Sequence, residues 1–338
     1  MKFNSSKLLF LMMLGFSSMI SISTNSWPAT WIGLEINLMA FIPLMLSNNM
    51  KSSEAAINYF IIQALASSIM LTFILISYTN MTMNENFHSI SKSMILLSLM
   101  IKMGAAPLHM WFPIVMEKLS WINCLILSTW QKLAPMMITS YLIDNNHLLS
   151  NLIIMLSISF GAIGGLNQTS IRKIMAYSSI NHLGWMLMAM KLSTTLWLIY
   201  YSIYTMMLSI MMTTFHITMS NFTNDLSLKM SYMMKFLIFM NFLSLGGLPP
   251  FLGFLPKWMI IIDLSQQMMY FLVFFMTSMT LIALYYYLQL ILSSLTLNMT
   301  QLKWNYQFKC SYKIKYLSIM TSLSILMLPM YSYLTYSF

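Results

Sequence analysis

Long runs of apolar residues, separated by short polar connections, set the pattern of this chain. A helix needs roughly 20 apolar residues to cross about 30 Å of hydrocarbon. We recognise eleven such runs, near residues 7–24, 27–46, 55–78, 92–112, 121–142, 148–166, 174–190, 195–219, 235–261, 269–295 and 316–337. The pattern therefore predicts an all-α, polytopic membrane protein with about eleven transmembrane helices and no soluble domain between them.

Glycine and proline interrupt two of these runs, and each interrupted run carries a lysine close to the interruption. The first interruption contains Gly104 and Pro107 and follows Lys102. The second contains the glycines and prolines of 246–250 and precedes Lys257. Lipid cannot satisfy the backbone groups that a broken helix exposes, so such breaks persist only where they line a polar or wet interior. Each interruption is therefore a candidate ion or proton site.

The two interrupted runs are the fourth and the ninth, which places them five helices apart. Because five is odd, a repeat of five helices inserts with the opposite orientation. We therefore predict two inverted five-helix repeats, near 7–142 and 148–295, and a terminal helix at 316–337, all within one membrane domain that covers 1–338. Interrupted helices at matching positions point to a transport site near the midplane. The alternative is that glycine and proline merely kink packed helices, which membrane helices tolerate.

Composition supports the membrane assignment and indicates an origin. Hydrophobic residues make up 59% of the chain and charged residues only 7%, whereas a soluble domain has about 25% charged residues. The chain contains 40 Met but a single arginine, Arg172. This bias is typical of an AT-rich animal mitochondrial genome, in which an isoleucine-type codon is read as Met. It predicts the mitochondrial inner membrane as the location.

The basic residues lie mostly on one side of the predicted bundle. With eleven alternating spans, two lysines, Lys92 and Lys191, fall on one face. Twelve basic residues fall on the face of the N-terminus: Lys2, Lys7, Lys51, Lys118, Arg172, Lys173, Lys229, Lys235, Lys303, Lys309, Lys313 and Lys315. The positive-inside rule then places the N-terminus on the matrix side. Topology and anionic lipids, including cardiolipin, account for the net charge of +10 without a nucleic-acid partner.

Three charged residues lie deep within predicted spans. Lys102 and Lys132 are ten and eleven residues into their runs, and Glu35 is eight residues into the second run. At about 1.5 Å per residue they lie roughly 12–17 Å deep, where a charge costs about 3 kcal/mol even on a lenient scale. Such residues are rare without a role. We expect Glu35 to be the carboxylate partner of a buried lysine.

These charges suggest a mechanism. A dry environment disfavours a charged amine, whereas a carboxylate at about 4 Å stabilises it by about 4 kcal/mol at an effective dielectric near 20. Carrying one charge across about 150 mV takes about 3.5 kcal/mol. Because the two energies are similar, movement of Glu35 relative to a lysine would switch that lysine between holding and releasing a proton.

Further candidates are Lys257, which follows the second interruption, and two histidines, His109 and His182. Histidine can relay protons near neutral pH, although a satisfied interior histidine is common. The sequence contains no His/Cys cluster with metal-ligand spacing, no phosphate-binding glycine loop and no nucleophile motif. We therefore expect no cofactor in this chain, and we expect redox chemistry in partner proteins.

Six stretches carry a resemblance to a known family, at 31–37, 102–113, 130–135, 161–173, 178–185 and 241–258. They closely resemble the subunit 2 family of mitochondrial NADH dehydrogenase, which comprises antiporter-like subunits of respiratory complex I. The Met-rich composition is similar to that of insect or other arthropod members. The resemblance implies a core membrane-arm subunit that contributes to proton translocation coupled to NADH:ubiquinone oxidoreduction. It also implies two inverted five-helix repeats and a polar axis through the membrane.

The same resemblance assigns roles to the candidate residues. Glu35 and Lys102 would form the first-half ion pair. Lys132 would be the central lysine, and Lys257 would be the second-half residue of the outward route. His109 and His182 would be relay or lining positions. NADH, FMN, iron–sulfur clusters and ubiquinone are expected in partner subunits, and the partners are other membrane-arm and accessory subunits. The eleven predicted helices are fewer than the fourteen of bacterial relatives and are similar to the shorter animal form.

Two other functions share these features. A stand-alone cation/proton antiporter would also have interrupted helices and buried lysines, but it would transport ions as an isolated chain. A structural spacer would use the buried charges only to hold the bundle together, and its assembly would fail before its proton transfer.

Overall fold

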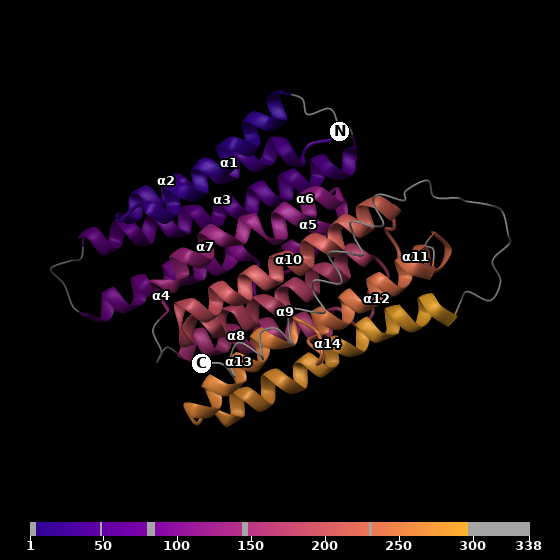
Figure 1. Cartoon of the computed structure of the whole chain (residues 1–338). Coiled ribbons are helices and arrows are strands. Elements are labelled where there is room, and N and C mark those ends of the chain that lie inside the picture. Colours follow the sequence, from indigo (N-terminus) through magenta and orange to yellow (C-terminus); the bar gives the residue numbers. More distant parts are fainter. Residues whose placement is uncertain (1–4, 48, 80–84, 144–147, 230–231, 297–338) are drawn as a thin grey trace, which may run out of the picture. The chain divides into compact units, whose positions relative to one another are not determined.

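The computed structural model describes residues 5–47, 49–79, 85–143, 148–229 and 232–296 (Figure 1). This described part is helical apart from turns and one isolated bridge between Ser170 and Phe222. The all-α prediction is confirmed. The predicted terminal helix at 316–337 and the basic residues from 303 onward lie outside the described residues.

The chain divides between Ser157 and Ile158 into two compact units. The first unit contains α1 (Ser5–Ser23), α2 (Trp27–Met45), α3 (Met50–Thr79), α4 (Glu85–Met103), α5 (Trp111–Lys118), α6 (Trp121–Ser128) and α7 (Trp130–Ser140). Within it α1 packs along α2, α2 along α3, and α3 along α4 and α5. Helix α7 contacts α1, α2, α4 and α6, so residues on α7 lie inside this unit.

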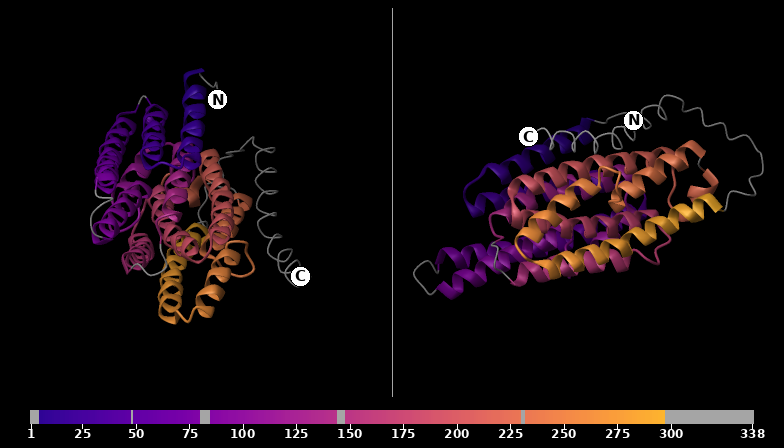
Figure 2. Two further views of the ribbon diagram at one scale, coloured as in Figure 1. Left: turned by 90° about the vertical axis from the view of Figure 1, so that its left-hand side faces the viewer. Right: turned by 60° about the horizontal axis from the view of Figure 1, so that its bottom comes forward.

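The second unit contains the end of α8 (Leu148–Gly164), followed by α9 (Ile171–Leu192), α10 (Thr194–Thr218), α11 (Thr223–Lys229), α12 (Tyr232–Gly246), α13 (Phe254–Gln266) and α14 (Tyr270–Thr296). Helix α9 contacts α10, α13 and α14, and every residue from Ser178 to Lys191 is buried. The orange and yellow helices α12 and α14 run side by side (Figure 2). Polar residues on α9 are therefore enclosed by protein.

The first ten predicted runs overlap described helices. Five of the described helices are long and apolar enough to cross a membrane: Ser5–Ser23, Trp27–Met45, Met50–Tyr78, Thr194–Thr218 and Tyr270–Ser293. One difference concerns the run at 121–142, which is two helices, α6 and α7, separated at Thr129 (φ −113°, ψ −79°). The Thr129 hydroxyl donates to the Leu125 carbonyl at 2.6 Å, and such a bond back to residue i−4 bends helices.

Both predicted interruptions are present, and the helix ends in the same type of backbone turn at each of them. Helix α4 ends at Met103 and α12 ends at Gly246, and the next residues, Gly104 and Gly247, have φ of 73° and 79°. In each turn the N–H groups of the glycine and of the residue after it bond back to carbonyls of the last helical turn. This is the Schellman pattern, in which a left-handed glycine ends a helix. The chain then resumes as α5 or α13.

Candidate functional site

In the first unit, Lys102 lies in the last turn of α4, beside the interruption. Its side chain is buried, with 7% of its surface exposed. Glu35 on α2 is partly buried, and its carboxylate is close enough to interact electrostatically with Lys102. In the described part of the chain these two side chains form no direct ion pair. The structure therefore brings the Glu35 carboxylate near the lysine with which the family resemblance pairs it, at a separation longer than a salt bridge.

Neutral side chains cap the end of α4. The Gln63 side chain donates from Nε2 to the Lys102 carbonyl at 3.1 Å, and the Trp111 indole donates from Nε1 to the Ile101 carbonyl at 3.1 Å. The last carbonyls of a helix have no partner within the helix and carry its negative pole. Here an amide and an indole satisfy two of them.

Lys132 lies in the first turn of α7, three residues after Thr129. It is 2% exposed, and its Nζ lies 4.7 Å from the centroid of the Phe112 ring. An aromatic face attracts an ammonium group at this distance. Phe112 also borders the first interruption, because a Cβ on Gly104 would lie 3.1 Å from the Phe112 Cβ. Phe112 thus links Lys132 to the turn that follows Lys102.

A buried chain of polar side chains joins three helices of this unit. The Tyr59 hydroxyl on α3 donates to Gln131 Oε1 at 3.3 Å, and Gln131 Nε2 on α7 donates to Asn37 Oδ1 on α2 at 3.2 Å. Gln131 directly precedes Lys132, and Asn37 lies two residues after Glu35. Sequence reasoning did not assign these residues, although a buried amide inside an apolar run is itself a signal, because burying it is costly unless it is paired.

His109 lies in the interruption between α4 and α5. Its side chain is 2% exposed, and its Nδ1 donates to the Pro107 carbonyl at 3.2 Å. The His109 carbonyl in turn accepts from the N–H of Phe112 at 3.0 Å, where α5 begins. His109 therefore takes part in the turn between the two half-helices.

In the second unit, Lys257 lies in the first turn of α13 and reaches back to the end of α12. It is 6% exposed. Its Nζ donates to the Gly246 carbonyl at 2.9 Å and to the Leu245 carbonyl at 3.4 Å. It also lies 5.9 Å from the centroid of the Trp185 ring on α9. The negative pole of α12 therefore holds this amine.

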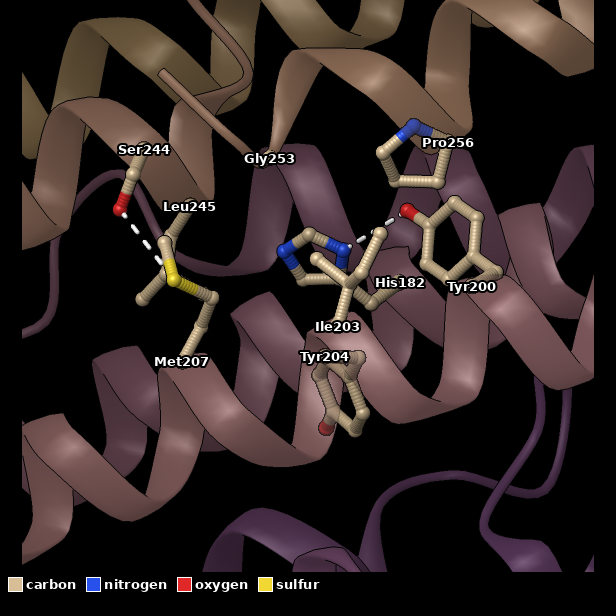
Figure 3. Close-up of a pocket in the computed structure, with 9 residues that line it drawn as sticks. All are labelled: His182, Tyr200, Ile203, Tyr204, Met207, Ser244, Leu245, Gly253 and Pro256. Carbon is tan, nitrogen blue, oxygen red and sulfur yellow. Dashed lines mark hydrogen bonds between the residues drawn. The ribbon is translucent and has the colours of Figure 1, made fainter. Parts of the chain in front are cut away.

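His182, in the middle of α9, faces two tyrosines of α10. Its Nδ1 is 2.9 Å from the Tyr200 hydroxyl, and its ring lies 5.2 Å from the ring of Tyr204. These rings line a small cavity, with room for about one water molecule. Figure 3 shows the imidazole directed toward Tyr200, with Ser244 and Met207 on the other side. Leu245 and Pro256 also line the cavity, so it adjoins the contacts of Lys257.

Three buried asparagine and tryptophan side-chain atoms of this unit have no hydrogen-bond partner among the described residues. They are Asn181 Oδ1, Trp185 Nε1 and Asn241 Oδ1. A buried polar atom without a protein partner is costly unless water satisfies it. Asn181 is next to His182 in sequence, and the Trp185 ring lies near the Lys257 amine. The interior around α9 is therefore suited to hold water.

The six candidate residues consequently form two groups. Glu35, Lys102, Lys132 and His109 lie in the first unit, and His182 and Lys257 lie in the second. All three lysines are within one turn of a helix end, including Lys132, whose break was not predicted. Over the described ranges, the structure contains no group of three or more His, Cys, Asp or Glu residues that could hold a metal ion. The arrangement suits proton handling by amines, imidazoles and hydroxyls.

Comparisons with known proteins identify the family. The family model described as NADH:quinone oxidoreductase/Mrp antiporter, TM, matches residues 24–283. A protein named NADH-ubiquinone oxidoreductase chain 2 from Anopheles gambiae is 46% identical over 317 residues, which cover 92% of each chain. This chain belongs to that chain 2 family. The Bos taurus chain 2 is 38% identical over 338 residues, which cover 96% of this chain and 95% of the bovine one.

Solved structures show the same fold at lower identity. A chain of respiratory complex I from Thermus thermophilus matches with a TM-score of 0.84 at 20% identity, over 96% of this chain and 80% of that one. A chain of the Mrp complex from Dietzia sp. matches with a TM-score of 0.74 at 16% identity, over 83% of this chain and 59% of that one. This chain therefore shares its fold with a chain of each of these two complexes.

Proposed function

We propose that this chain is a core membrane-arm subunit of respiratory complex I. It contributes to proton translocation across the mitochondrial inner membrane, coupled to NADH:ubiquinone oxidoreduction. Membership of the chain 2 family supports this assignment. The observation that carries the proton-handling part is the position of three buried lysines, each within one turn of a helix end inside an apolar bundle. Backbone interruptions at such depth are tolerated where they line a polar interior.

The residues take the following parts in this proposal. Glu35 and Lys102 are the charge pair of the first unit. Lys132 is the central lysine, and Lys257 takes part in the outward route. His109 and His182 line the proton route or relay protons along it. Tyr200 orients the ring of His182 through its hydroxyl. Because Glu35 interacts with Lys102 without touching it, a shift of either side chain changes the electrostatic stabilisation of the amine.

The surroundings follow from the same assignment. The N-terminus faces the matrix, and the partners are other membrane-arm and accessory subunits together with membrane lipids, including cardiolipin. Flavin, iron–sulfur clusters, NADH and ubiquinone belong to partner subunits. The Mrp complex shares the fold, which keeps the antiporter alternative in view. Identity of 46% over most of the chain to a protein named for NADH-ubiquinone oxidoreductase favours complex I.

Replacing Lys132 or Lys102 by methionine tests the function. Methionine has a similar length but carries no proton, so either variant should reduce protons pumped per NADH oxidised by roughly tenfold or more. The complex should still assemble and insert. The measurement is proton uptake by proteoliposomes that contain the variant complex I, alongside NADH oxidation and the amount of assembled complex.

Lys51→Met is the matched control, because Lys51 is exposed at the start of α3. It should leave proton yield and assembly unchanged. Normal pumping by both Lys102→Met and Lys132→Met would refute the proposed function. Loss of assembly with an unchanged proton yield in the remaining complex would instead indicate a structural spacer. Sodium-dependent transport by the isolated chain would indicate a stand-alone antiporter.

A further inference from the structure

Gly247, the first residue after α12, occupies a position in which only hydrogen leaves room for Lys257. A Cβ at this position would lie 2.9 Å from both Cδ and Nζ of Lys257 and 3.2 Å from its Cε. Three atoms of the lysine side chain therefore cover the α-carbon of Gly247. The backbone of Gly247 also has φ of 79°, which L side chains rarely adopt.

This close approach is what brings the amine to the end of the helix. Lys257 Nζ donates to the carbonyls of Gly246 and Leu245, the two residues that precede Gly247. These carbonyls lie at the negative end of α12, where a cation is favoured. With 6% of its surface exposed, Lys257 obtains its electrostatic stabilisation there from the backbone.

We propose that Gly247 is a positioning residue for Lys257. Because Gly247 has no side chain, the lysine amine has room to lie on the carbonyls of Leu245 and Gly246. This inference rests on the proposed role of Lys257 in proton translocation. Any side chain at 247 displaces the amine from the helix end and so removes the charged group from its place in the proton route.

The first interruption separates this role from the ordinary reason for glycine. Gly104 has the corresponding position in the turn that ends α4, with φ of 73°. A Cβ there would meet Phe112, at 3.1 Å from its Cβ, and would meet no lysine among its three nearest atoms. The need for a left-handed backbone is thus common to both turns, whereas the contact with a lysine belongs to the second.

A double-mutant cycle tests the inference in complex I reconstituted into proteoliposomes. The variants are Gly247→Ala, Lys257→Ala and the double variant, and the measured quantity is protons pumped per NADH oxidised. We expect Gly247→Ala to lower this yield by about fivefold or more, and the double variant to stay within about twofold of Lys257→Ala, because residues that act through one another are not additive. A normal yield in Gly247→Ala, or losses that multiply in the double variant, would overturn the inference.

The same cycle also decides the outcome if Gly247→Ala assembles poorly. Removing the Lys257 side chain frees the space that the new methyl group needs, so the double variant should assemble better than Gly247→Ala alone. Gly104→Ala reports how much assembly is lost through backbone strain at the corresponding position. An assembly loss of equal size with and without Lys257 would show that the lysine contact is irrelevant, which contradicts the inference.

A control variant and a structure of Gly247→Ala test the positioning role directly. Gly246→Ala keeps its carbonyl and adds a Cβ no closer than 3.5 Å to its neighbours, so its effect should be much smaller than that of Gly247→Ala. A high-resolution structure of Gly247→Ala should show Lys257 Nζ away from the Gly246 carbonyl. If Lys257→Ala alone keeps a normal yield, the proposed role of Lys257 fails and this inference fails with it. If Lys257→Ala lowers the yield and Gly247→Ala does not, the role of Lys257 stands and the positioning role of Gly247 is refuted.

Discussion

The interrupted helices of the two units end in the same backbone turn, but different side chains cap them. At the end of α4 the caps are neutral, a glutamine and an indole. At the end of α12 the cap is the amine of Lys257. In the first unit Glu35 interacts with Lys102 through space, so the groups that end the helix and the group that stabilises the amine are different. In the second unit one lysine serves both purposes.

This difference has a structural consequence. In the first unit, loss of the charge on Lys102 would leave these caps of α4 in place, because they are Gln63 and Trp111 and not the lysine amine. In the second unit, loss of the charge on Lys257 weakens the bonds that hold the end of α12, because hydrogen bonds with an ionised donor are roughly twice as strong as neutral ones. Protonation and helix termination are therefore coupled at the second interruption and separate at the first.

The largest effect should come from Gly253→Ala, near the start of α13. A Cβ at this position would lie 1.8 Å from the Ser244 carbonyl oxygen, and a backbone oxygen cannot rotate away. We expect a loss of stability at or above the upper end of about 1–3 kcal/mol for overpacking, measured as thermal unfolding and yield of the assembled complex. Gly104→Ala should cost less, because its nearest contact is a side-chain atom at 3.1 Å. Equal losses would mean that both turns are equally close-packed.

An intermediate effect should follow from Trp111→Phe, which removes the indole cap of α4. The Ile101 carbonyl keeps the N–H of Gly104 but loses the indole, and the smaller ring leaves part of a buried site unfilled. Together these losses should cost about 1–3 kcal/mol in stability. Since the cap is neutral, protons pumped per NADH should change little in the complex that assembles. Thermal unfolding and proton yield, measured on one preparation, separate the two quantities. A fall in proton yield comparable to that of a lysine variant would show that the first interruption also couples its cap to transport.

The smallest effects should come from removing single hydroxyls. Tyr200→Phe removes the 2.9 Å partner of His182, and Tyr59→Phe removes a 3.3 Å bond to Gln131. Each should cost about 0.5–1.5 kcal/mol in stability. Because Tyr200 contacts a candidate relay, its variant should also lower proton yield, whereas Tyr59→Phe should not. Identical proton yields in the two variants would remove His182 from the route.

The sequence predicted the helices and the two glycine–proline interruptions because those signals are local. Apolar runs of sufficient length predict spans, and Gly104 and Gly247 end helices through their own backbone geometry. The break at Thr129 was not predicted, because neither glycine nor proline marks it. It coincides with a hydroxyl bond to Leu125 within one turn, which a run of apolar residues does not reveal.

The site was predictable residue by residue, whereas its partners were not. Lys102, Lys132 and Glu35 stand out because charge is rare in apolar runs. The caps on α4 come from α3 and from the residue that begins α5, and the partners of Lys257 are backbone carbonyls. Such pairs depend on how helices meet in space, so one sequence does not reveal them. Whether these residues carry protons stays a prediction.

The glycines near the end of α8 show where this helix packs closely against α9. A Cβ on Gly161 would lie 2.5 Å from the backbone nitrogen of Asn181, and one on Gly164 would lie 2.4 Å from the ring of Tyr177. Small residues allow two membrane helices to approach this closely, and such interlocked backbones do not slide past each other. We therefore expect any conformational change near His182 to involve rotamers of single side chains, while α9 stays packed against α8.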